Sequence, residues 1–243
     1  GYNGINLWGS AKMINTEFKF DGSVANEWVD ACSADKTYEF NACTVNGQPL
    51  KKSNVDFRNS GTILIFDGIK YITAKEADGL TAAIKAAQSG SNILLADGTF
   101  NGHFDLTQKT LSIEAINNGK AKIEGMVWAD NCNLTLKGLT LSNPNGVQHP
   151  NPSNSKYYND INKKYPVVGA YLNSNITFDG CIFNLTGPTG YGFYGYAANT
   201  PVFTNCTFNC NKIRPIANNG DAITVTGCTF NDQYHYSVRI FEN

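Results

Sequence analysis

Three segments carry one short pattern: Asn-Ile-Thr-Phe-Asp-Gly-Cys-Ile-Phe-Asn at 175–184, Pro-Val-Phe-Thr-Asn-Cys-Thr-Phe-Asn at 201–209, and Ala-Ile-Thr-Val-Thr-Gly-Cys-Thr-Phe-Asn at 222–231. In each, apolar and polar residues alternate, a bend carrying Asn, Asp or Gly follows, and a second short strand begins. Such alternation is typical of half-buried strands. Cys181, Cys206 and Cys228 are 25 and 22 residues apart. A period of this length is typical of one turn of a β-solenoid.

Weaker copies of the pattern extend the repeat to both halves of the chain, at 12–18, 37–45 and 133–143. The equivalent positions of all six copies are expected to form a ladder that points into the core: Thr16, Cys43, Leu139, Cys181, Cys206 and Cys228. Free cysteine is among the most buried residue types, so unpaired stacked thiols are the favoured interpretation. A disulfide or a reactive role stays open as the alternative.

The composition of the chain excludes several classes of protein. Its 243 residues include 31 Asn and 23 Gly, but only 16% are charged, against about a quarter in an average globular protein. The 19 basic and 20 acidic residues give a net charge of -1, so no basic footprint for nucleic acid is present. No apolar run is long enough for a transmembrane helix. The seven cysteines show no zinc spacing, and neither a metal site nor a cofactor is predicted.

A helix is predicted inside segment 69–104, because Leu80, Ala83, Ile84 and Ala87 recur at helical spacing and Gly90 follows them. An apolar strand and an Asp-Gly turn come directly after it. This passage resembles the opening of right-handed parallel β-helix proteins of the pectate-lyase-like superfamily, where a short helix caps the first coil. Trimeric β-helix proteins of viral surfaces are closest in character. The resemblance implies an all-β, right-handed parallel β-helix with one capping α-helix near 75–89.

The order of the segments is unusual for that family, because about seventy residues precede the cap-like helix. Residues 1–45 are expected to form β-helix coils or a swapped arm, 46–68 a polar connector, and 69–243 the main β-helix. One explanation is a circular permutation, in which Gly1 and Asn243 lie close together. The rival explanation is an N-terminal arm that adds coils to a neighbouring subunit.

Two segments are predicted to interrupt the coils as loops, at 143–166 and 187–199. Loops on a rigid scaffold commonly carry binding sites. Their aromatic residues are candidates to bind a glycan or a partner subunit: Tyr157, Tyr158, Tyr191, Phe193, Tyr194 and Tyr196. A structural role of these rings in the core is an equally weighted alternative.

No catalytic set emerges from the sequence. Glycoside hydrolysis requires two carboxylates on facing positions, and no such pair stands out. The weak candidates for chemistry are Lys212, Arg214, Asp221 and His235, and surface charge near the last coils is the favoured interpretation of them. The sequence therefore favours a non-enzymatic protein.

The expected function is that of a virion surface protein, a phage capsid decoration or a fibre-like component that stabilises the capsid or attaches to a host surface. The expected partners are two further copies of the chain in a homotrimer, a capsid or tail protein, and a glycan, with neither nucleic acid nor membrane insertion. The alternative is a polysaccharide lyase or hydrolase, or a glycan-binding adhesin, that is secreted or displayed on a bacterial cell surface.

Overall fold

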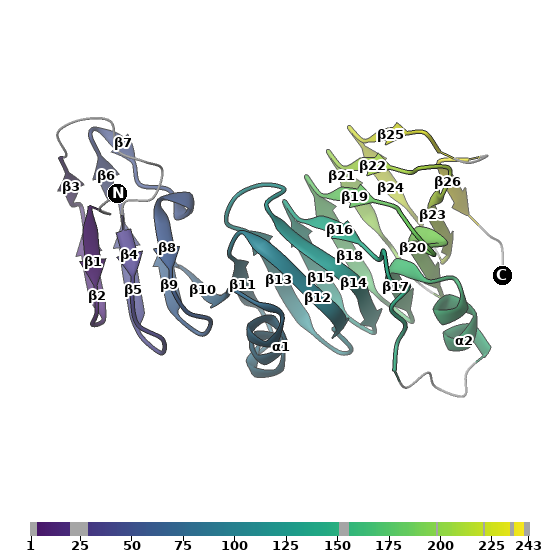
Figure 1. Cartoon of the computed structure of the whole chain (residues 1–243), viewed down its shortest axis with the longest axis horizontal. Coiled ribbons are helices and arrows are strands. Elements are labelled where there is room, and N and C mark those ends of the chain that lie inside the picture. Colours follow the sequence, from purple (N-terminus) through teal and green to yellow (C-terminus); the bar gives the residue numbers. More distant parts are fainter. Residues whose placement is uncertain are drawn as a thin grey trace.

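The protein is a parallel β-solenoid of about nine turns, and its described residues include two short α-helices (Figure 1). The computed structural model describes residues 4–19, 29–150, 156–197, 199–220, 222–233 and 236–240, and side chains of these except 156–158. The predicted all-β solenoid with a short capping helix is confirmed. The rest of the architecture departs from a single stack of coils, because the strand direction of the sheet that spans both halves reverses between residues 66 and 69.

The strands of the described residues form four sheets. The longest sheet that spans both halves runs in the order β2 (Ala11–Ile14), β5 (Thr37–Asn41), β9 (Ile63–Phe66), β10 (Ile69–Ala74), β11 (Ser91–Leu95), β13 (Thr110–Ala115), β15 (Asn133–Lys137), β18 (Asn175–Asp179), β21 (Val202–Thr204) and β24 (Thr224–Thr226). We call it the shared sheet.

The other sheets close the turns. The wall of the C-terminal half runs in the order β25 (Thr229–Asn231), β22 (Thr207–Asn209), β19 (Ile182–Asn184), β16 (Thr140–Ser142), β14 (Ala121–Asp130), β17 (Pro166–Tyr171), β20 (Tyr191–Tyr196), β23 (Arg214–Asn219) and β26 (Val238–Ile240), with β12 (Gly98–Asp105) paired to β14. The N-terminal half adds two small sheets, β1 (Ile5–Leu7), β4 (Val29–Ala31) and β8 (Val55–Phe57), and β3 (Glu17–Phe18), β6 (Thr44–Val45) and β7 (Gln48–Pro49).

The strand direction reverses between β9 and β10, which form the antiparallel pair of the shared sheet. The two strands are joined by a tight turn at Asp67 and Gly68, both with positive φ, of 46° and 81°. On either side of this hairpin the neighbouring strands are parallel. The hairpin therefore divides the solenoid into an N-terminal part and a C-terminal part.

The hydrophobic core changes sides of the shared sheet at the same place. Leu94 of β11 packs with Leu64 and Tyr71 in the core of the N-terminal part. Its neighbours Ile93 and Leu95 pack in the core of the C-terminal part. Adjacent residues of a strand point to opposite faces of its sheet, so the two cores lie on opposite faces. Since both the strand direction and the side of the core are reversed, the two parts wind with the same hand.

This arrangement explains why turns precede the cap-like helix. The first strands pair only with N-terminal neighbours, β1 with β4 and β2 with β5. They lie at the opposite end of the molecule from β26 (Figure 1). Circular permutation, which needs adjacent ends, does not describe this order. Gly1 and Asn243 themselves lie outside the described residues, and the swapped arm stays untested.

The capping helix α1 spans Ala77–Ala86 and covers the start of the C-terminal core. Leu80, Ala83, Ile84 and Ala87 pack into this core, as their helical spacing predicts. After the helix, the ammonium group of Lys109 lies 3.5 Å from the carbonyl oxygen of Ala87. A positive charge beside the C-terminus of a helix interacts favourably with the negative end of the helix dipole.

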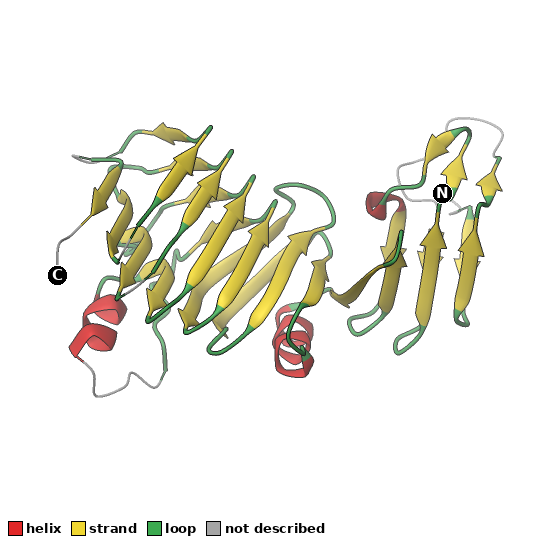
Figure 2. Cartoon of the chain, turned by 180° about the vertical axis from the view of Figure 1, so that it is seen from behind, coloured by secondary structure: helices red, strands yellow, loops and turns green. Residues whose placement is uncertain are grey.

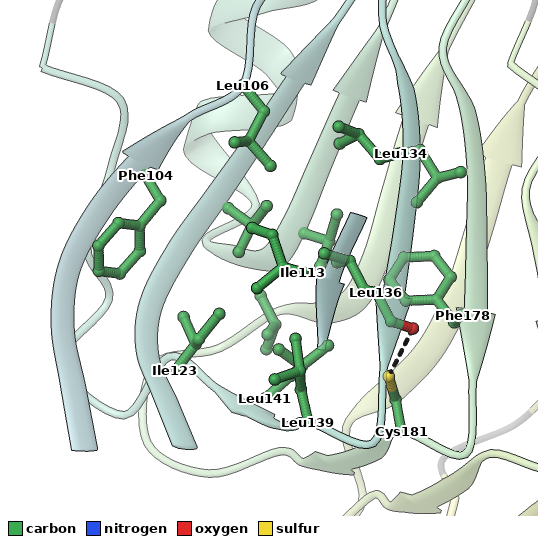
Figure 3. Packing of buried hydrophobic residues seen from close by; sticks show 14 of the residues in the cluster. Phe104, Leu106, Ile113, Ile123, Leu134, Leu136, Leu139, Leu141, Phe178 and Cys181 are labelled. Carbon is green, nitrogen blue, oxygen red and sulfur yellow. Dashed lines mark hydrogen bonds between the residues drawn. The ribbon is translucent and has the colours of Figure 1, made fainter. Parts of the chain in front are cut away.

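The predicted ladder positions fall into two stacks, one in each part. Backbone bonds join Thr16 to the turn of Cys43, and Leu139, Cys181, Cys206 and Cys228 follow one another on consecutive turns of the C-terminal part. Each thiol donates to a carbonyl of the preceding turn: Cys43 to Met13, Cys181 to Leu136, Cys206 to Phe178 and Cys228 to Phe203 (Figure 3 shows the second). Each thiol therefore donates a hydrogen bond to a backbone carbonyl oxygen, which a methyl group in its place could not do.

Two segments that the sequence predicts as connectors or loops belong to the solenoid instead. Segment 46–68 contains β7, β8 and β9 and a short 3-10 helix, Lys52–Asn54. Segment 187–199 contains β20, a full strand of the C-terminal wall. The glycines that suggested a loop permit close packing there, since a Cβ on Gly192 would lie 2.6 Å from the carbonyl oxygen of Pro215.

The segment 143–166 does leave the solenoid, and it carries the second helix, α2 (Lys156–Lys163). The ring of Trp128 and the side chain of Ile161 are fully buried in a third cluster, which lies between α2 and the outer face of the C-terminal wall. Helices α1 and α2 project from the same edge of the molecule (Figure 2).

An ion pair joins the two parts of the solenoid. The ammonium group of Lys52 lies 2.5 Å from the carboxylate of Glu114 and 3.2 Å from the hydroxyl of Tyr71. Burial lowers the pKa of Lys52, but the hydrogen bond and charge of Glu114 outweigh it and raise the pKa above 10.5. The pair therefore fixes the N-terminal part on β13.

Candidate functional site

A pair of glycines positions the most promising site of the chain. Strands β12 and β14 pair in register over eight residues, with Gly102 opposite Gly125. Their φ values are 138° and 156°, and a Cβ on Gly125 would lie 1.8 Å from the carbonyl oxygen of Gly102. Only glycine fits such a close approach at positive φ. Just beyond it, Phe104 packs in the C-terminal core while His103 and Asp105 line a cleft beside α1.

The cleft has a volume of about 360 Å³ and lies between α1 and β12. We call it the α1–β12 cleft. Ile84 and Phe104, both buried, provide its apolar lining. The remaining lining residues are polar or charged: Thr81 and Lys85 of α1, His103 and Asp105 of β12, and Thr107 and Lys109 of the turn that follows. An apolar floor with a few convergent polar groups is typical of small-molecule sites.

Asp105 is held in place by the turn after β12. One carboxylate oxygen accepts hydrogen bonds from the backbone N–H of Thr107 at 2.9 Å and from its hydroxyl at 2.6 Å. The other oxygen lies 3.7 Å from Nε2 of His149. The carboxylate therefore lines the cleft with one oxygen hydrogen-bonded to Thr107 and the other near His149.

Two histidines from distant segments meet at the edge of the cleft. The ring of His149 lies edge-on to His103, with 4.7 Å between centroids, and 4.9 Å from Trp128. The backbone N–H of His149 donates to the side chain of Asn162 in α2 at 2.8 Å, and that amide donates back to the carbonyl of His149 at 3.3 Å. These bonds fasten His149 to α2 at the edge of the cleft.

His103 is neutral at pH 7. Burial, with a smaller contribution from the neighbouring His149, lowers the pKa of His103 to about 4, and Asp105 partly opposes this shift. In the part of the chain that the structure describes, Nε2 of His103 is buried without a hydrogen-bond partner. The imidazole is thus available as an uncharged donor or acceptor.

Of the four weak catalytic candidates, the structure describes Lys212 and Arg214. Lys212 is 70% exposed and pairs with Asp232. The guanidinium of Arg214 lies 5.7 Å and 6.0 Å from the ring centroids of Tyr191 and Tyr236. Asp221 and His235 lie outside the described residues. Lys212 and Arg214 thus have different surroundings, and neither lines the α1–β12 cleft.

Three of the described aromatic candidates are buried, and Tyr196 is half-buried. Phe193 is fully buried in the C-terminal core. Tyr191 and Tyr194 are 6% and 4% exposed in the cluster beneath α2. The hydroxyls of Tyr194 and Tyr196 both donate to Asp160 of α2, at 3.2 Å and 3.1 Å. The tyrosine rings therefore form the surface on which α2 packs. Little of the area of the buried rings is left to contact a sugar.

The side chains of Tyr157 and Tyr158 are not among those described, although the backbone of α2 is. Burial also raises the pKa of Tyr191 to about 12, with smaller contributions from Tyr236. Its phenol therefore stays protonated at neutral pH.

Sequence reasoning missed the residues of the α1–β12 cleft. The one local signal was the alternation of His103 and Asp105 directly after Gly102. The contribution of His149 depends on how the 143–150 segment folds back, and no spacing in the sequence encodes that.

Comparisons with known proteins do not assign this chain to a family. A scan against protein-family models and a search of curated proteins found no match.

Among the described residues, no three His, Cys, Asp or Glu side chains gather closely enough to hold a metal ion. None of the helices described above is both long and apolar enough to cross a membrane.

Proposed function

We propose that this protein is a rigid, non-enzymatic attachment protein that binds a carbohydrate in the α1–β12 cleft. A virion surface is the location we propose for it, and a homotrimer is its proposed assembly. The observation that carries the proposal is the cleft itself. Its volume of about 360 Å³ falls in the range of ligand pockets, and its two ammonium groups, two hydroxyls, imidazole and carboxylate suit a polyhydroxylated ring.

The frame that holds the cleft supports the attachment role. Stacked phenylalanines fill the C-terminal core, with Phe178 and Phe203 at 4.6 Å and 3°, and Phe183 and Phe208 at 4.4 Å and 10°. Such close packing gives side chains one arrangement and resists deformation. A site on a sheet wall and a packed helix is also held more precisely than one on a free loop.

The chemistry of the lining supports binding over catalysis. Hydrolysis of a glycoside uses two carboxyl groups, one of them protonated. Among the described residues that line the α1–β12 cleft, Asp105 is the one that carries a carboxylate. Both of its oxygens already face Thr107 or His149.

The proposed trimer has apolar surface to bury at the N-terminal end. Trp8 and Ile14 are 65% and 49% exposed there. Light scattering should give a mass near three chains, and a monodisperse monomer at micromolar concentration would remove the trimer from the proposal.

A glycan array followed by calorimetry tests the binding site. We expect binding of at least one oligosaccharide without cleavage, and a loss of affinity of tenfold or more in Lys85→Glu. Lys51→Glu is the matched control, because Lys51 is an exposed lysine far from the cleft lining. Absence of binding across the array, or equal affinity in both variants, would refute the role of the cleft.

One observation favours a second candidate, a glycan-active enzyme. The imidazole of His103 lies in the same cleft as Asp105, and its lowered pKa of about 4 leaves it unprotonated at neutral pH, in the form that a general base requires, although as a weak base. A reducing-end assay over polysaccharides decides between the two. New reducing ends that disappear in His103→Gln, with binding retained, would establish the enzyme.

A further inference from the structure

The thiol ladder of the C-terminal part offers a modification site that is independent of the cleft. Cys181, Cys206 and Cys228 occupy one position on three consecutive turns. The carbonyl of Cys181 accepts from the N–H of Thr207, and that of Cys206 from the N–H of Thr229, both at 2.9 Å. Paired strands lie about 4.8 Å apart. This spacing falls within the Cα separation of roughly 4.4 to 6.8 Å that disulfides bridge.

The side chain of Cys228 is already in contact with Cys206. The sulfur of Cys228 accepts the backbone N–H of Cys206 at 3.4 Å. Each thiol donates to a carbonyl one turn back, Cys206 to Phe178 and Cys228 to Phe203, both at 3.5 Å. The two thiols therefore point the same way from adjacent turns, so rotation about the Cα–Cβ bonds brings one sulfur toward the other.

The three thiols differ in their access to solvent. Cys181 is fully buried and Cys206 is 1% exposed, whereas Cys228 lies half-buried on the last of these turns. A small oxidant can therefore reach Cys228 first. Hydrogen bonds from Cys181, opposed by burial and supported by Cys228, lower the pKa of Cys206. A thiol with a lowered pKa is a better second nucleophile.

We propose that Cys206 and Cys228 form an intramolecular disulfide when the protein meets a peroxide. In the first step the sulfur of Cys228 attacks the peroxide, the O–O bond breaks, and a sulfenic acid and one water form from hydrogen peroxide. In the second step the sulfur of Cys206 attacks the sulfenic sulfur, and the hydroxyl leaves as a second water. Two thiols are oxidised by two electrons, and one peroxide is reduced to two waters.

The bond would lock the last turn onto the turn before it. It closes a loop from residue 206 to residue 228, which lowers the entropy of the unfolded chain. Stacked positions hold Cβ atoms near the strand spacing, slightly wider than the usual Cβ separation of about 3.8 Å. Such a bond is readily reduced again, so the device is a reversible stabiliser of this end of the solenoid.

Peptide mapping of the whole protein tests the proposal. The native protein is treated with hydrogen peroxide, blocked with iodoacetamide and digested with trypsin. We expect a disulfide between peptide 165–212, which holds Cys206, and peptide 213–239, which holds Cys228. Fragment spectra assign the bridge among the three cysteines of the first peptide. A rise in Tm of about 5 °C that dithiothreitol reverses should accompany it.

Three variants sharpen the result. Cys228→Ser and Cys206→Ser should each lose the bridge and the rise in Tm. Cys210→Ser should keep both, because Cys210 is equally buried, lies near Cys206 and donates its thiol to Phe208 outside the ladder. A bridge that uses Cys181 or Cys210, or oxidation of Cys228 to a sulfinic acid with Cys206 still reduced, would overturn the proposal. The wild-type map alone decides if Cys206→Ser fails to fold.

Discussion

Removing Phe203 from the phenylalanine stack of the C-terminal core should cost a large part of the stability of the protein. Phe203 is fully buried. Its ring stacks on Phe178 at 4.6 Å, and the rings of Phe193, Phe208 and Phe183 follow at 5.7, 5.6 and 6.1 Å. Phe→Ala in a core costs about 3–5 kcal/mol. Four aromatic neighbours place Phe203→Ala at about 4 kcal/mol, which lowers Tm by about 12 °C in a chain of this length.

Phe230→Ala is the matched control. This residue belongs to the same stack, but it is half-buried and its one stacked partner is Phe208, at 4.8 Å and 8°. We expect a cost of about 1.5 kcal/mol for it. Calorimetry and urea unfolding measure both variants. A cost for Phe203→Ala no larger than that for Phe230→Ala would refute the packing argument.

Three further predictions concern charge and burial. Glu114→Gln should lower the free energy of unfolding by about 1 kcal/mol at pH 8 after allowance for solvent screening. In urea titrations this loss should vanish above pH 10.5, where Lys52 deprotonates through its raised pKa. Because the pKa of His103 is about 4, stability should fall as the pH falls from about 6.5 to 4. His103→Gln should flatten that part of the curve of Tm against pH. Cys206→Asp should prevent cooperative unfolding or lower Tm far more than Lys212→Ala does, because it buries a carboxylate; equal Tm values would contradict the inward ladder.

Much of the C-terminal part could be predicted from the sequence. The repeats around Cys181, Cys206 and Cys228 contain both strands and the bend of each turn, so local alternation alone defines them. The spacing of Leu80, Ala83 and Ile84 likewise defines α1.

The reversal at Asp67 and Gly68 could not be predicted in the same way. An Asp-Gly hairpin is a local signal, but which face of β10 and β11 meets which core depends on contacts across the whole shared sheet. Ile93, Leu94 and Leu95 are all apolar, and such a run does not show that its neighbours face two different cores.

The candidate site was harder to predict for a related reason. The residues concerned lie in three separate segments of the chain: Lys85, Asp105 and His149. The turns of the solenoid bring Lys85 and Asp105 together in the lining of the α1–β12 cleft, and His149 reaches the edge of that cleft. The aromatic residues drew attention instead, although Tyr194 and Tyr196 serve to hold α2 through Asp160. Glycine-spaced rings look alike in sequence whether they face solvent or a helix.

The two-core arrangement, in which one sheet carries cores on opposite faces, is tested most directly by methyl NOEs in the protein with labelled leucine, isoleucine and valine. The methyls of Leu94 should show contacts to Leu64 of the N-terminal core, and those of Leu95 to the C-terminal core that contains Leu80 and Ile113. Contacts from both residues to one and the same core would contradict the arrangement, and with it the frame that positions the α1–β12 cleft.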